Sequence, residues 1–236
     1  MDLSMKDKLA LVTGASRGIG AATAIALAAK GAHVVLTART ASGLEAVEQA
    51  IFDAGGSATI APLDLTQTDA IGRLASAVSE RWQALDVLVL NAGTLGTLAA
   101  VPAIDARELA QVLTLNVSAP VALIQAFDPL LRRSASGRVI GVTSSVGRTP
   151  RAYWGAYGAS KAAFETMLGA YGDEMEATSK VRVAVLDPGA TRTTMRARAY
   201  PGEDPNSVKA PQVVAERIAA LAEQGFEAGH FERVEG

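Results

Sequence analysis

The stretch Leu9-Ala-Leu-Val-Thr-Gly-Ala-Ser-Arg-Gly-Ile-Gly20 decides the fold. Five residues typical of a buried strand are followed by glycines at positions 14, 18 and 20, and then by an Ala-rich helical pattern that runs to Lys30. Glycine permits a tight turn, lets backbone N–H groups reach a pyrophosphate and lets the helix pack closely on the sheet. The N-terminus of that helix presents a partial positive charge to the phosphate. A strand-to-helix turn without a ligand is the alternative, and the flanking strand and helix favour the dinucleotide site.

The same alternation continues along the chain. Short apolar runs predict strands at 9–13, 33–38, 57–63, 85–90, 138–143, 182–186 and 230–234. Longer Ala-rich runs predict helices at 19–30, 42–54, 68–83, 106–131, 156–177 and 211–223. Strands that are apolar throughout and separated by helices predict an α/β fold of Rossmann type, a doubly wound parallel sheet of about seven strands with helices on both faces. Residues 1–236 are expected to form a single domain, with a lid at about 189–211 that includes the polar stretch 197–211.

Composition and charge exclude several classes of protein. The 236 residues carry a formal net charge of −2, which gives no reason to expect nucleic acid or an anionic membrane as partner. There is no cysteine for disulfides or thiolate sites, and with two histidines a metal site is not expected. The first eight residues are polar, and the apolar stretches are expected to be far below the ~18 residues that span a bilayer. A soluble, cytoplasmic protein is therefore expected.

Tyr157 and Lys161 are four residues apart in an expected helix, so they share one of its faces. A free tyrosine has a pKa near ~10, and lowering it by ~3 units takes about 4 kcal/mol. A lysine ammonium at ~4 Å supplies about that much in an effective dielectric of ~20. The pair occurs by chance on many helices, but Ser144 upstream, at the end of an expected strand, favours a proton-transfer site.

These motifs together resemble the short-chain dehydrogenase/reductase family. The segments 148–157 and 195–201 resemble a bacterial branch of uncharacterised oxidoreductases within it. The resemblance covers essentially the whole chain and rests on Thr13-Gly-Ala-Ser-Arg-Gly-Ile-Gly20, Asn91-Ala-Gly93, Asn116, Ser144, Tyr157-x-x-x-Lys161 and Pro188-Gly189. It implies an enzyme that transfers a hydride between a nicotinamide cofactor and a carbonyl compound or secondary alcohol.

The resemblance also implies catalytic roles. Tyr157 is expected to donate and accept the proton, and Ser144 to hydrogen-bond the same substrate oxygen. Lys161 is expected to bond the nicotinamide ribose, and Asn116 to hold a water that connects Lys161 to solvent. Because Asn116 lies in a helical run with two prolines, a local kink is expected there. Ser145 is the competing serine, and the Val-Gly pair after it favours Ser144.

The cofactor is expected to be NADP(H). Ala38 stands where an NAD-binding member has an acid, and Arg17 and Arg39 flank the site with guanidinium groups that suit a phosphate. The alternative is that both arginines are solvated surface charges. In the family, an acid at the position of Asp64 binds the adenine amino group. A helix N-cap or turn acid is an equally good interpretation of Asp64. The resemblance implies a cofactor site made of Gly14, Ser16, Arg17, Gly18, Ile19, Gly20, Arg39, Asp64, Leu65, Asn91, Ala92, Gly93, Tyr157, Lys161, Pro188, Gly189, Thr191 and Thr193.

Several questions stay open at this level. The substrate side, residues 148–154 and the region after Gly189, carries Arg148, Arg151, Arg192, Arg196 and Arg198, and no acid lies between Gly189 and Tyr200. They either steer an anionic substrate or are solvated charges and cofactor contacts, and the second is the plainer interpretation. An idle NADP(H)-binding sensor and a non-redox elimination are the alternatives to a carbonyl reductase. By analogy, a homodimer or homotetramer is expected to form through helices 106–131 and 156–177.

Overall fold

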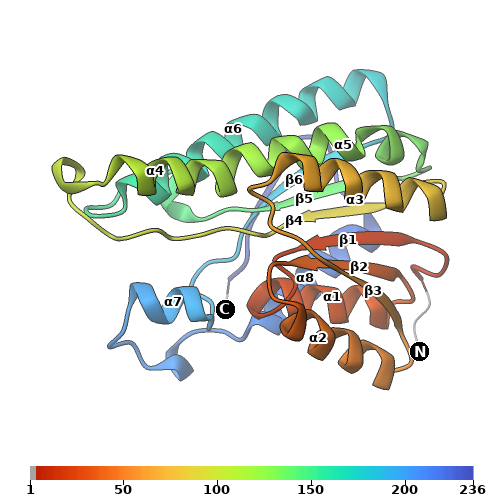
Figure 1. Ribbon diagram of the computed structural model, residues 1–236, viewed down its shortest axis with the longest axis horizontal. Helices are drawn as coiled ribbons and strands as arrows, with labels where there is room; N and C mark the ends of the chain where they lie inside the picture. The colour runs from red at the N-terminus through yellow and green to blue at the C-terminus, as the bar shows by residue number, and fades with distance from the viewer. Residues whose placement is uncertain (1–3, 236) are drawn as a thin grey trace.

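The computed structural model describes residues 4–235, apart from the side chain of Thr68. A parallel sheet of seven strands lies at the centre of this described part, in the order β3-β2-β1-β4-β5-β6-β7 (Figure 1). The strands are β1 (Leu9–Thr13), β2 (His33–Ala38), β3 (Ser57–Pro62), β4 (Val87–Leu90), β5 (Arg138–Val142), β6 (Arg182–Asp187) and β7 (His230–Arg233). The predicted fold class, a doubly wound parallel sheet of Rossmann type, is confirmed.

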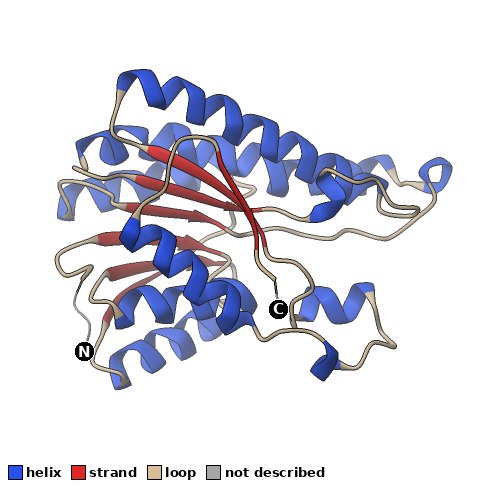
Figure 2. Ribbon diagram, turned by 180° about the vertical axis from the view of Figure 1, so that it is seen from behind, coloured by secondary structure: helices blue, strands red, loops and turns tan. Residues whose placement is uncertain are grey.

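The burial of β1 explains why its sequence is apolar throughout. Ala10 and Val12 lie in the core on one face of the sheet, and Leu9 and Leu11 lie in the core on the other. Helices cover both faces, so alternate side chains are buried on both sides (Figure 2). One face carries α1 (Gly18–Ala29), α2 (Ala41–Asp53) and α8 (Pro211–Gln224), and the other carries α3 (Thr68–Arg81), α5 (Ala119–Arg133) and α6 (Gly155–Thr178).

The strand order reverses between β1 and β4, and this marks the part of the carboxyl edge where a ligand would bind. From β1 the chain winds outward through β2 and β3, then returns to pair β4 with β1 and winds outward the other way. The loops that follow β1 and β4 therefore diverge at the carboxyl edge of the sheet. Ligands of such sheets bind in the crevice at this point.

The expected single helix at 106–131 is two helices. The first, α4 (Ala106–Leu113), is followed by a π-helical turn, Thr114–Ser118, which leads directly into α5. Asn116, where a local kink was expected, lies inside this π turn, which interrupts the regular α-helical hydrogen bonding. A π turn widens a helix locally, so some backbone carbonyls leave the regular α-helical hydrogen-bond pattern.

The segment 189–211 was expected to be a loop or lid. It contains a helix of its own, α7 (Thr194–Ala199), and a 3-10 turn, Pro205–Ser207. In Figure 1 this segment extends away from the sheet, beside its carboxyl edge. The sequence did not predict α7.

The helical stretch Ala106–Arg133 corrects one expectation from the sequence. By length and composition alone it is long and apolar enough to cross a membrane, with a mean hydropathy of 1.4 over its most apolar window. Leu123 and Phe127 from this stretch are buried in the core on the sheet. A core helix has the same length and composition, so this is weak evidence for a membrane span.

Candidate active site

The glycine turn brings helix α1 against the end of β1. Gly14 and Gly18 have φ angles of +66° and +58°, in the left-handed region that favours glycine. A Cβ on Gly20 would lie 2.3 Å from the carbonyl oxygen of Gly14 and 2.5 Å from Nδ2 of Asn91. The turn is therefore a backbone-lined cradle, closed by the N-terminus of α1, and only glycine fits at position 20. Arg17 is exposed at the N-cap of α1.

A hydrogen-bond network joins β1 to β4 beside this turn. The Thr13 hydroxyl donates to the Val89 carbonyl at 3.0 Å and accepts from the backbone N–H groups of Asn91 and Ala92 at 2.9 and 3.0 Å. The Asn91 side chain donates to the Thr13 carbonyl at 2.9 Å. Thr13 therefore fixes the predicted Asn91-Ala-Gly93 segment next to the glycine turn. The sequence analysis did not include Thr13 in the site.

Asn116 projects from the π turn into the same edge. Its Oδ1 accepts from the Thr94 N–H at 2.8 Å, and its Nδ2 donates to the Thr94 carbonyl and to the Ser160 hydroxyl, both at 2.9 Å. Ser160 in turn donates to the Tyr157 carbonyl at 2.7 Å. This connection fixes the start of α6 relative to the loop after β4. Thr94 and Ser160 were missed by the sequence analysis, although Ser160 is next to Lys161.

Tyr157 and Lys161 lie side by side on the buried face of α6. The Lys161 Nζ is 5.8 Å from the centroid of the Tyr157 ring and donates to the Val142 carbonyl, at the end of β5, at 2.9 Å. A Cβ on Gly93 would lie 3.2 Å from Asn116 Oδ1 and 3.8 Å from Lys161 Nζ. The structure thus brings the loop after β4, the π turn and α6 together at one point.

Ser144 is the serine that faces Tyr157. It follows β5 in extended backbone, and its side chain is near enough to the Tyr157 hydroxyl to act on the pKa of that phenol. Ser145 begins the 3-10 turn Ser145–Gly147. Of the two serines, Ser144 is therefore the one that lies near Tyr157.

Burial governs the pKa values of both α6 side chains. It raises the pKa of Tyr157 above its ordinary value, the charge of Asp187 adds to this, and the hydrogen bond with Ser144 opposes it. Burial lowers the pKa of Lys161 to about 8, while the charge of Glu165 acts in the opposite direction. The net effect of the protein's own groups on the pKa of Tyr157 is therefore upward, whereas a lowering by Lys161 was expected. Helical spacing put the two side chains on one face, but it did not reveal how deeply both are buried.

The segment after β6 meets the glycine turn from the other side. The Asp187 carboxylate accepts from the Gly189 N–H at 2.9 Å, and Gly189 has a φ of +60°. Thr191 is buried, and its hydroxyl donates to the Pro188 carbonyl at 2.9 Å. A Cβ on Gly18 would lie 3.5 Å from the Thr193 methyl group, so this segment and the glycine turn line one crevice.

The remaining predicted residues lie at the β2 and β3 end of the crevice. Arg39 is exposed directly after β2, near enough for its charge to help lower the pKa of the Asp64 carboxyl. The larger cause is Thr66, which donates to Asp64 from its N–H at 3.0 Å and its hydroxyl at 2.8 Å. Asp64 therefore caps a turn, the alternative left open by the sequence. Leu65 is buried in the core, which leaves its backbone for a ligand.

Two predicted residues lie on the glycine turn itself. Ser16 and Ile19 are both half-buried there. Ser16 packs close to the start of α2, where a Cβ on Gly43 would lie 2.9 Å from the Ser16 Cβ. Within residues 4–235, the structure shows no group of three or more metal-ligating side chains that could hold an ion.

Comparisons with known proteins agree with this arrangement. The family model for short chain dehydrogenases matches residues 8–204. The oxidoreductase YciK of Escherichia coli K12 is 38% identical over 210 residues, which are 88% of this chain and 82% of that protein. The structure of a short chain dehydrogenase from Pseudomonas syringae has a TM-score of 0.96 at 38% identity, covering 100% of this chain and 97% of that one.

A structure described as a complex with NADP, from Shigella flexneri, has a TM-score of 0.93 at 34% identity and covers 100% of both chains. The family match spans most of the sequence, and the folds agree along the whole chain. This chain is therefore an oxidoreductase that belongs to the short-chain dehydrogenase/reductase family, in the bacterial branch of uncharacterised oxidoreductases.

Proposed function

We propose that the protein is an NADP(H)-dependent oxidoreductase that interconverts a carbonyl compound and a secondary or primary alcohol. One observation carries the proposal. A buried tyrosine and a buried lysine lie side by side on α6, at the sheet edge that also carries the glycine cradle. Ser144 and Asn116 reach the same place from β5 and the π turn.

The crevice fits a dinucleotide. Gly14 and Gly20 leave no room for a Cβ in the turn before α1, where backbone N–H groups and the helix dipole favour a pyrophosphate. Arg17 and Arg39 are exposed near the end of β2, where Ala38 replaces an acid, and they suit a 2′-phosphate. The relative from Shigella flexneri, described as an NADP complex, supports the same choice. Asn91-Ala-Gly93, Pro188, Gly189, Thr191 and Thr193 would line the nicotinamide half.

The bound cofactor supplies or accepts the hydride. In the reducing direction the Tyr157 hydroxyl donates a proton to the carbonyl oxygen, and the Ser144 hydroxyl hydrogen-bonds the same oxygen. Lys161 places a cation next to the phenol and would bond the ribose of a bound cofactor. Asn116 acts through Ser160, which fixes the backbone of Tyr157.

Burial also favours the protonated form of the Tyr157 phenol. Because burial raises the pKa of Tyr157, the phenol carries its proton at neutral pH. This is the form that a proton donor in carbonyl reduction needs. In the oxidising direction, the phenolate must be stabilised by Lys161, whose own pKa of about 8 leaves most of it charged at neutral pH.

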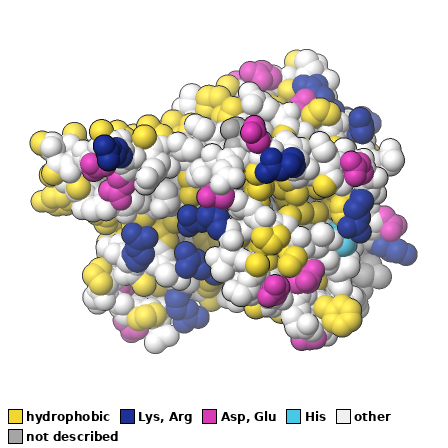
Figure 3. All heavy atoms as spheres, viewed as in Figure 1, with side chains coloured by type: hydrophobic (Ala, Val, Ile, Leu, Met, Phe, Trp, Pro, Cys, Tyr) yellow, Lys and Arg dark blue, Asp and Glu magenta, His cyan; other side chains and the backbone are white. Residues whose placement is uncertain are grey.

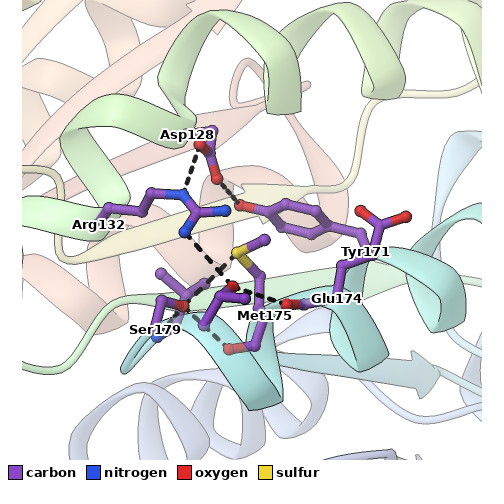
Figure 4. Close-up of polar contacts among 8 residues, drawn as sticks. Asp128, Arg132, Tyr171, Glu174, Met175 and Ser179 are labelled. Carbon is purple, nitrogen blue, oxygen red and sulfur yellow. Dashed lines mark hydrogen bonds and ion pairs between the residues drawn. The ribbon is translucent and has the colours of Figure 1, made fainter.

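The test compares two buried tyrosines of the same helix. Tyr171 lies further along α6, where its hydroxyl donates to Asp128 at 2.7 Å and the other Asp128 oxygen pairs with Arg132 (Figure 4). Tyr157→Phe is expected to lower kcat/KM for aldehyde reduction by ~10³-fold. Tyr171→Phe is expected to leave kcat/KM within about twofold, since its partner is remote from the crevice.

Binding separates catalysis from folding in this test. Both variants are expected to bind NADPH with unchanged Kd, measured by nucleotide fluorescence. If Tyr157→Phe retains full turnover, the proposed role of Tyr157 is wrong. If it loses NADPH binding, Tyr157 has a structural role.

We also propose that the protein forms a homodimer or homotetramer through α5 and α6. The outer face of α6 exposes Met167 together with small residues such as Gly169 and Ala170. Small side chains let two copies of a helix pack closely across a symmetry axis. Light scattering of the purified protein measures the oligomeric state, and a monomer at micromolar concentration would contradict this assembly.

A further inference from the structure

An apolar cluster surrounds Tyr157. Leu95, Val146 and Tyr157 are buried together, and Leu98, Trp154, Met195 and Ala199 pack against them. These residues come from the loop after β4, the turn after β5, the residue before α6, and α7. They belong to four separate segments, and none of the seven side chains is charged.

Trp154 is the central wall of this cluster. Its ring lies edge-on to Tyr157, with 6.0 Å between the centroids and an interplanar angle of 62°. On its other side it contacts Tyr200, at 5.8 Å and 35°. A bridge with Ala99 and the strained φ of +71° at Tyr153 fix its backbone. Trp154 therefore presents a flat apolar surface between Tyr157 and the lid.

Two of the arginines near the lid, Arg196 and Arg148, are paired with carboxylates of the protein itself. Arg196 Nε is 2.7 Å from the Glu203 carboxylate, and its NH2 group reaches the other oxygen at 2.5 Å. Arg148 Nε is 2.6 Å from Glu165, which lies on α6. Figure 3 shows basic side chains gathered around the hollow on this face, with an acidic side chain beside them. A guanidinium already paired with a carboxylate has little attraction left for an anionic substrate.

Two further arginines tie the lid to its surroundings. Arg151 donates to the Tyr200 hydroxyl, and Arg192 to the Asn206 side chain at 3.3 Å. The lid therefore rests on the apolar cluster through Met195 and Ala199, and Tyr157 is only 7% exposed. A substrate that reaches Tyr157 must replace these apolar contacts with contacts of its own.

We propose that this cluster lines the substrate site and selects uncharged carbonyl compounds with an apolar, preferably flat, substituent, and that Trp154 and Met195 are the residues that determine this specificity. The inference rests on the proposed function and names its substrate class. It favours the interpretation in which Arg148 and Arg196 are structural charges and not contacts for an anionic substrate. A carboxylate placed against this cluster would lose its hydration without gaining a partner.

Matched pairs of aldehydes test the inference. Benzaldehyde is compared with 4-carboxybenzaldehyde, and hexanal with 6-oxohexanoate, by the loss of NADPH absorbance. We expect kcat/KM to be higher for the neutral member of each pair by at least about 100-fold. Trp154→Ala is expected to raise the KM of benzaldehyde by about 10-fold or more, with the Kd of NADPH unchanged.

A positive charge introduced into the cluster tests the substrate preference more sharply. Met195→Lys places an ammonium in the cluster. It is expected to lower the ratio of kcat/KM between the neutral and the carboxylated aldehyde of each pair by at least about 10-fold. Val213→Lys, at an exposed position of α8, is the control and is expected to leave this ratio unchanged.

The outcomes separate the two proposals. If the carboxylated aldehydes are reduced as well as the neutral ones, the apolar substrate class is wrong and the oxidoreductase function stands. If Met195→Lys leaves the ratio unchanged, Met195 is not a specificity residue. If none of the four aldehydes consumes NADPH although the protein binds it, the proposed function fails and this inference fails with it.

Discussion

Replacing Gly20 by alanine inserts a methyl group into the tightest backbone contact of the cofactor crevice. The new Cβ would lie 2.3 Å from the Gly14 carbonyl oxygen, whereas real Cβ contacts are not shorter than 3.0 Å, so the turn and helix α1 must separate by about 0.7 Å. Overpacking of this kind costs about 1–3 kcal/mol, and the higher helix propensity of alanine offsets about 1 kcal/mol. The free energy of unfolding should therefore fall by at most about 2 kcal/mol, a change in Tm of up to ~8 °C.

The effect on cofactor binding should exceed the effect on stability. A charge-assisted hydrogen bond from a backbone N–H to a phosphate contributes about 1.5–3 kcal/mol, so displacing one raises the Kd of NADPH by ~10- to 100-fold. The control is Gly72→Ala in α3, where nothing lies within 4 Å of the new Cβ. That variant should gain ~0.5–1 kcal/mol of stability with unchanged Kd. Fluorescence titration and thermal unfolding measure both quantities. An unchanged Kd in a folded Gly20→Ala protein would refute the idea that this turn holds the pyrophosphate.

Three further changes test other parts of the site. Asp187→Asn keeps an acceptor for the Gly189 N–H but removes the negative charge that raises the pKa of Tyr157. The pH at which the rate of alcohol oxidation rises should therefore move to lower values. An unshifted pH profile would show that this charge has no influence. Asn116→Ala removes three hydrogen bonds, two with the Thr94 backbone and one with the Ser160 hydroxyl, and should cost about 2–3 kcal/mol, or ~5–10 °C in Tm by calorimetry; an unchanged Tm would contradict this network. Arg39→Ala should raise the Kd of NADPH by ~10-fold and leave that of NADH unchanged, as measured by titration; equal losses for both nucleotides would argue against a 2′-phosphate contact.

The sheet and the cradle were predictable because their causes are local. A parallel strand buried on both faces is apolar at every position, as 9–13 shows, and a glycine-rich turn after such a strand has few other uses. The break near Asn116 was also predictable, since prolines follow within the same helical run. Here the local sequence and the tertiary structure agree.

The parts that the sequence did not predict depend on distant contacts. Helix α7 has only six residues, and it is held by the Thr193 cap and by the packing of Met195 and Ala199 on the Tyr157 cluster. The pKa of Tyr157 depends on complete burial and on the charge of Asp187, thirty residues later in the chain. Neither burial depth nor a neighbour from another strand can be read from the spacing of residues on α6.

Transfer of a label tests the central claim most directly. NADPH that carries deuterium at its transferable position is incubated with benzaldehyde and the protein, and the benzyl alcohol is analysed by mass spectrometry and NMR. A hydride delivered from the nicotinamide to a carbonyl beside Tyr157 predicts one deuterium on the carbinol carbon, and none in the Tyr157→Phe reaction. Alcohol without deuterium, or labelled alcohol formed equally fast by the Tyr157→Phe protein, would contradict the account.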